Sequence, residues 1–170
     1  MRDDLASIRE GIAISKRQIE NTLIHVLRDN FEYLRIGQCV HSSEDVDMHD
    51  KIDVICRNLD DANRNITIAF RCQKERFAHF RSSTFTEREI RVYRQSARPL
   101  PTIAVHAYMT DDDRLVSMGV IEGYHLRNTI DWSRYTPRDS GGRKKVFRAV
   151  WWSHYPHLFR VIEPAPLFGQ

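Results

Sequence analysis

Residues suited to binding a polyanion gather in two parts of the sequence. Residues 57–98 hold ten Arg and Lys against five acids, and residues 134–148 hold six bases against Asp139 alone. Aromatic residues lie among these bases, and this combination offers stacking surfaces beside partners for phosphate groups, as nucleic-acid binders use. The bases predicted to contact nucleic acid are Arg76, Arg81, Arg143, Lys144 and Lys145. A solvated charged face and core packing of the rings are the alternatives.

Short motifs narrow the chemistry further. The sequence has no P-loop, GxGxxG, GxSxG, HExxH or CxxC, so it gives no local support to nucleotide-fold, serine-hydrolase or zinc-protease chemistry. It does have an acidic residue on a predicted helix, Glu20, and an acidic loop that ends in Asp50-Lys51-Ile52-Asp53. A later predicted strand carries Arg71 and Gln73 on its polar face, with Lys74 beside them.

This arrangement resembles the restriction-endonuclease-like fold, the PD-(D/E)XK superfamily, over residues 18–152. The resemblance implies an α/β or α+β fold with a central mixed β-sheet flanked by helices, and hydrolysis of DNA phosphodiesters with magnesium. It implies that Asp53 and Glu20 bind the metal through carboxylate oxygens, which magnesium prefers. It also implies that Gln73 takes the place of an acid, and that Lys74 or Arg71 orients water or stabilises the phosphorane.

The second strand departs from the superfamily's pattern, in which an acid is followed two residues later by lysine. This sequence offers Arg71-Cys72-Gln73, or Cys72-Gln73-Lys74 with the acid missing, and a guanidinium in place of a carboxylate would repel a metal ion. The second hypothesis is therefore a non-catalytic nucleic-acid-binding or protein-interaction module on the same scaffold. Asp53 also has a structural alternative, because aspartates often bond to backbone amides.

The composition is that of a folded chain. Its 170 residues fit one domain of about 100–200 residues, predicted as helices over 4–34, a sheet core over 52–152 and a tail over 153–170. No apolar run approaches the roughly 18 residues of a membrane span, and the first four residues lack a secretory pattern. We therefore expect a cytoplasmic protein without membrane contact, and a homodimer would be the commonest oligomer.

The cysteines do not form a recognisable framework. Cys39, Cys56 and Cys72 are odd in number and include no CxxC pair, so neither a disulfide framework nor a zinc knuckle is predicted. Buried thiols are the expected state.

Hydrophobic periodicity predicts the elements. Apolar residues at helical spacing indicate a helix over 18–34, and a short first helix is predicted over 5–14, with Gly11 arguing against one unbroken helix. Alternation predicts a hairpin and four further strands, over residues 52–57, 66–73, 89–93, 102–109, 114–121 and 146–152. His106, inside one of these strands, is expected to be a core or edge histidine rather than a ligand.

Overall fold

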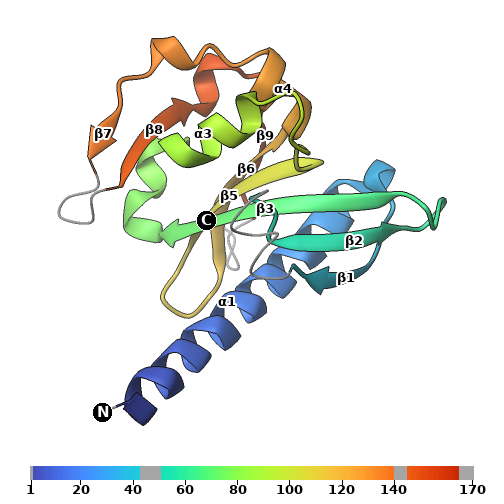
Figure 1. Ribbon diagram of the computed structural model, residues 1–170, viewed down its shortest axis with the longest axis vertical. Helices are drawn as coiled ribbons and strands as arrows, with labels where there is room; N and C mark the ends of the chain where they lie inside the picture. Colours follow the sequence, from blue (N-terminus) through green and yellow to red (C-terminus); the bar gives the residue numbers. More distant parts are fainter. Residues whose placement is uncertain (1, 43–50, 140–144, 165–170) are drawn as a thin grey trace.

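The computed structural model describes residues 2–42, 51–139 and 145–164, and its first element is one long helix, α1 (Arg2–Asn30) (Figure 1). The prediction of a separate short helix was wrong, because the roughly 1 kcal/mol that glycine costs inside a helix does not end one. The predicted end at Leu34 was also late: α1 stops at Asn30, and a short 3₁₀ turn, η1 (Glu32–Leu34), follows.

A six-stranded mixed sheet forms the centre of the fold, with the order β1-β2-β3-β5-β6-β9. Strands β3 and β5 are parallel, and the other neighbours in this sheet are antiparallel. The strands are β1 (Ile36–His41), β2 (Val54–Asn58), β3 (Asn65–Lys74), β5 (Ile103–Met109), β6 (Leu115–Glu122) and β9 (Arg160–Ile162). The prediction of an α+β fold around a mixed sheet is confirmed at this level.

The two faces of this sheet are covered by different layers (Figure 1). On one face α1 contributes Leu23, Ile24 and Leu27 to a core with residues of β2, β3 and β5. On the other face lie the helices α3 (Glu87–Arg94) and α4 (Gly123–Asn128) and a three-stranded sheet of order β4-β8-β7. Its strands are β4 (Ser82–Thr86), β7 (Arg138–Asp139) and β8 (Val146–Trp151), and the 3₁₀ turns η2 (Glu75–Phe80), η3 (Trp132–Arg134) and η4 (Trp152–His154) connect this layer.

Trp152 joins the second layer to the sheet. Its ring lies so close to the backbone of Gly119 in β6 that a Cβ at this position would overlap it. The indole Nε1 donates a hydrogen bond of 2.9 Å to Oγ of Ser83 in β4. The absence of a side chain at Gly119 therefore lets the two layers approach each other.

Three element predictions need correction. Residues 89–93 were predicted as a strand, but they lie in α3, which begins with a capping box between Thr86 and Glu89 and buries Ile90 and Tyr93 at helical spacing. The sheet also begins earlier than predicted, with β1, and the predicted tail over 153–170 contains β9. The other predicted strands and the hairpin are confirmed within one or two residues.

The expectation of three buried thiols was wrong. Cys39 in β1 and Cys56 in β2 are cross-strand partners and form a disulfide. Cys72, by contrast, is a free and exposed residue. None of the described helices is long and apolar enough to cross a membrane.

Candidate functional site

A cavity of about 400 Å³ opens where β3 runs past the end of β2. Strand β2 begins at Val54, opposite Ile68, so the edge of β3 from Ala69 onward lacks β2 as a neighbour. The cavity lies at this free edge of β3, so side chains from both faces of the strand line it, together with residues from the elements that cover each face. They include Lys16, Asp53, Ala69, Arg71, Glu89 and His106.

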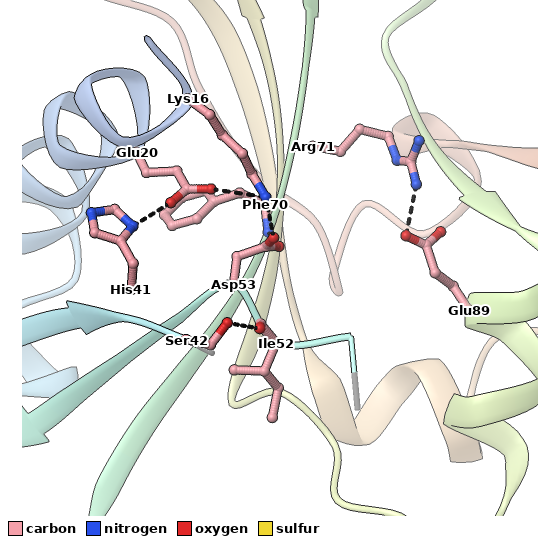
Figure 2. A network of polar contacts seen from close by, with 9 residues as sticks. All are labelled: Lys16, Glu20, His41, Ser42, Ile52, Asp53, Phe70, Arg71 and Glu89. Atoms are coloured by element: carbon pink, nitrogen blue, oxygen red, sulfur yellow. Dashed lines mark hydrogen bonds and ion pairs between the residues drawn. The ribbon is translucent and has the colours of Figure 1, made fainter. Parts of the chain in front are cut away.

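Two carboxylates meet at Lys16, a lysine that lines this cavity. Nζ of Lys16 lies 3.0 Å from Oδ1 of Asp53 and 3.7 Å from Oε1 of Glu20 (Figure 2). Lys16 and Glu20 stand four residues apart on α1, which places them on one face of the helix. On the other side of Glu20, its Oε2 lies 2.7 Å from Nδ1 of His41 in β1. The structure therefore brings together the two residues predicted to bind metal, and adds Lys16 and His41 to them.

Glu20 is an unusual carboxylate because it is almost fully buried. Only 2% of the residue is exposed, and among the described residues its Oε1 accepts no hydrogen bond. Burial raises the pKa of Glu20, and the charge of Asp53 adds to this, while Lys16 and His41 act in the opposite direction. A carboxyl oxygen is costly to bury without a hydrogen bond, and the cation that faces this one is the ammonium of Lys16, 3.7 Å away.

Asp53 uses its two oxygens differently. Oδ2 accepts a 2.7 Å hydrogen bond from the backbone N–H of Phe70 in β3, and Oδ1 accepts one from Lys16. The structural alternative predicted for this residue, a bond to a backbone amide, is thus present for one oxygen. The amide bond fixes the carboxylate against β3 and leaves Oδ1 directed at the lysine.

Arg71 lies at the same cavity but on the opposite side of β3 (Figure 2). Its guanidinium pairs with Oε1 of Glu89 at 2.7 Å. The second oxygen of Glu89 accepts a 2.6 Å bond from the backbone N–H of Thr86, which belongs to the capping box of α3. The start of α3 therefore holds Arg71 in place.

Gln73 and Lys74, the other two residues predicted to be catalytic, do not line this cavity. Oε1 of Gln73 lies 3.1 Å from Nε2 of His106, and Lys74 makes a 3.7 Å ion pair with Asp111 in which both side chains are mostly exposed. Residues 71 and 73 share a face of β3, but Gln73 is two residues farther along the strand and lines a neighbouring cavity.

His106 is a satisfied core histidine, as expected. It is 2% exposed, and its Nδ1 accepts a 3.0 Å hydrogen bond from the backbone N–H of Thr84. Burial, with the charge of Arg71, lowers the pKa of His106 to about 3. The ring is therefore neutral at physiological pH, and its proton is on Nε2, where it is donated to Gln73.

The predicted nucleic-acid contacts fall in three places. Lys145 lines the cavity, and Arg76 is exposed on η2, with its guanidinium 4.8 Å from the ring of Phe77. Arg81 pairs with Glu163. Arg143 and Lys144 lie outside the described residues.

Sequence reasoning missed Lys16, His41 and Glu89. Two of them left a signal: Lys16 precedes Glu20 by four residues, and Thr86-x-x-Glu89 is a capping-box pattern. The contact of His41 depends on β1, which was not predicted. Within residues 2–42, 51–139 and 145–164, no three His, Cys, Asp or Glu residues group closely enough to hold a metal ion by themselves.

Comparisons of this chain with protein-family models, with curated proteins and with solved structures found no match.

Proposed function

We propose that this chain is a magnesium-dependent nuclease that hydrolyses DNA phosphodiesters at the cavity beside β3. The observation that carries the proposal is the meeting of Glu20 and Asp53, from α1 and from the start of β2, around one cation at 3.7 and 3.0 Å. The resemblance to restriction-endonuclease-like proteins supports it. That resemblance expects a helix with an acid, then a hairpin whose first strand carries an aspartate, and α1, β2 and β3 follow this order.

The residues fit a magnesium ion. Magnesium is commonly bound by one or two protein carboxylates, while waters and substrate phosphates complete its shell. Glu20 and Asp53 supply two carboxylates, and the buried Oε1 of Glu20 has no hydrogen-bond donor among the described residues. Bound there, the ion would polarise a phosphoryl oxygen and make its bound water more acidic.

The chain's own residues position the substrate. The cavity is lined by four cations, Lys16, Lys51, Arg71 and Lys145, and by two acids, Asp53 and Glu89. This excess of positive charge attracts a phosphate. His41 holds Glu20 through Oε2, and the Phe70 amide holds Asp53 through Oδ2. These contacts leave one oxygen of each carboxylate turned toward Lys16, which lines the cavity.

Binding without cleavage is the second candidate function, and two observations favour it. Lys16 already neutralises both carboxylates. In addition, an acid two residues before Arg71 would stand at Ala69, which lines the cavity with a methyl group. On this alignment the acid of the superfamily's pattern is lost and arginine replaces its lysine. The cations would then hold a phosphate that is not hydrolysed.

One experiment separates the two functions. Purified protein is titrated with Mg²⁺ or Mn²⁺ in the presence of labelled single-stranded, duplex and branched DNA, and binding and cleavage are recorded together. Asp53→Asn keeps an oxygen for the Phe70 amide and removes the charge, and Asp111→Asn, on an exposed carboxylate away from the cavity, is the matched control.

Metal-dependent cleavage that Asp53→Asn abolishes and Asp111→Asn leaves intact is the result expected of a nuclease. Binding that weakens steeply with salt, needs no divalent ion and is never followed by cleavage identifies the non-catalytic module. Cleavage at an unchanged rate in Asp53→Asn refutes the assignment of this site.

A further inference from the structure

A second cavity, of about 380 Å³, adjoins the first on the side of the sheet that β4 and β8 cover. Its floor contains the buried rings of Tyr108 and Tyr135, which are 1% and 6% exposed. Its rim carries Phe80 and Trp151, which are 41% and 37% exposed and whose ring centroids lie 6.5 Å apart. Large rings that are partly open to solvent beside a cavity provide flat surfaces for a planar ligand.

One polar group in this cavity has a fixed hydrogen-bonding direction. The backbone N–H of Thr84 donates to Nδ1 of His106, so the proton of this neutral ring is on Nε2. Nε2 therefore donates to Oε1 of Gln73. The amide oxygen of Gln73 is occupied, and its NH₂ group makes no hydrogen bond with the described residues. Gln73 lines the second cavity, where it offers this NH₂ group as a donor.

Two arginines add positive charge to the same cavity. Arg134 and Arg138 line it, and both residues are exposed. Neither forms an ion pair within the described parts of the chain. The cavity thus combines aromatic surfaces, a directed amide donor and guanidinium groups, which is the chemistry that binds an unstacked base of single-stranded nucleic acid and its phosphates.

The two cavities share a wall. Thr84 lines both of them. The hydrogen bond between His106, which lines the first, and Gln73, which lines the second, crosses this wall. A nucleic-acid strand whose phosphate lies beside Lys16 and Arg71 would therefore have the second cavity next to it, on the other side of this wall.

We propose that the second cavity binds one unstacked nucleobase of a single-stranded nucleic acid whose backbone passes the first cavity. The position of the backbone rests on the proposed function, whereas the base-binding chemistry rests on the second cavity alone. The inferred substrate class is a strand with an unpaired or extruded base, and the amide of Gln73 donates to an acceptor atom on the base edge.

The test measures base binding without cleavage. Fluorescence anisotropy in EDTA compares a labelled oligothymidylate with a strand of the same length in which abasic residues replace the thymidines. Trp151→Ala removes an exposed ring from the rim, and Tyr124→Ala removes a more exposed ring from α4 that does not line the cavity. Gln73→Glu keeps an oxygen for His106 and exchanges the donor for an acceptor.

The expected result is that the thymidine strand binds about tenfold or more tightly than the abasic strand, the range that stacking of one base supports. Trp151→Ala should remove most of this difference, Gln73→Glu should reduce it at least threefold, and Tyr124→Ala should leave it unchanged. Equal binding of both strands, an unaffected Trp151→Ala variant, or no binding of either strand overturns the inference.

Failure of this inference and failure of the proposed function are distinguishable. If the protein still discriminates between the two strands in EDTA after Asp53→Asn, and no metal supports cleavage, then the second cavity binds a base and the proposal of a nuclease is wrong. If metal-dependent cleavage is lost in Asp53→Asn but abasic and thymidine strands bind equally, then the nuclease proposal holds and the second cavity does not bind a base.

Discussion

Lys16 occupies the place where the proposed metal would be held. Its ammonium is 3.0 Å from Asp53 and 3.7 Å from Glu20, so a divalent ion can share these carboxylates only if the lysine moves away. Replacing Lys16 by methionine keeps much of the side chain's length and removes its charge. We therefore expect Lys16→Met to bind Mn²⁺ or Mg²⁺ more tightly than the wild-type protein does.

The size of the effect follows from the geometry. Two unit charges 4 Å apart interact by about 1 kcal/mol in bulk water and about 4 kcal/mol at the effective dielectric of a protein surface. The side chain of Lys16 is 53% exposed, so solvent screening favours the lower part of this range. A gain of about 1–2 kcal/mol corresponds to about five- to thirtyfold tighter metal binding.

Isothermal titration of the DNA-free protein with Mn²⁺ measures this directly. Lys74→Met is the matched control, because Lys74 pairs with an exposed aspartate away from the cavity and its loss should change the affinity little. If the Mn²⁺ affinity of Lys16→Met is unchanged or weaker, the metal does not bind at Glu20 and Asp53, and the proposed metal site is refuted.

Two further predictions concern stability. Because burial raises the pKa of Glu20 above its ordinary value of 4.5, the wild-type protein should lose stability as the pH rises from 4.5 through the folded-state pKa. Urea unfolding from pH 4 to pH 8 should show a smaller loss in Glu20→Gln, and parallel pH profiles would contradict this. Reduction of the disulfide between Cys39 and Cys56, which are 17 residues apart, should lower the free energy of unfolding by about 3 kcal/mol. Urea unfolding with and without a reductant measures the change, and equal midpoints would mean that the bond does not constrain the unfolded chain.

Sequence patterns predicted the strands well where the alternation of apolar residues was the only periodicity in the segment. The hairpin of β2 and β3 and the strands β5, β6 and β8 were found because their apolar residues alternate. The segment of α3 alternates too, through Ile90 and Val92, but the capping box at Thr86 and the burial of Ile90 and Tyr93 three residues apart make it a helix. Where a short segment fits both the helical and the strand periodicity, tertiary packing decides which structure forms, and the sequence of the segment alone does not show that packing.

The candidate site was predictable only in part, for a related reason. Glu20 and Asp53 were chosen from the order of elements, and the structure brings them to one lysine. The contact of His41 and the disulfide both depend on the register of β1 against β2, which no spacing in the sequence specifies. Gln73 and Lys74 were chosen from the spacing of the superfamily's pattern. Lys74 lies on the other face of β3 from Arg71, because successive side chains of a strand alternate, and Gln73 shares the face of Arg71 but lies two residues farther along, at the second cavity.

The geometry of β3 also explains why one chain supports both candidate functions. Asp53 and Glu20 meet Lys16 on the α1 side of this strand, while Arg71 lies on the other side (Figure 2). Gln73 shares the face of Arg71, and its partner His106 is the neighbour of Arg71 on β5. A nuclease needs the first group to exchange its lysine for a metal, whereas a binding module needs only the cations. The second cavity, where we propose that a base binds, would serve either function, because its rings and its amide donor contact the nucleic-acid strand away from the scissile bond. Metal affinity in Lys16→Met therefore tests catalysis without testing recognition, and base discrimination in EDTA tests recognition without testing catalysis.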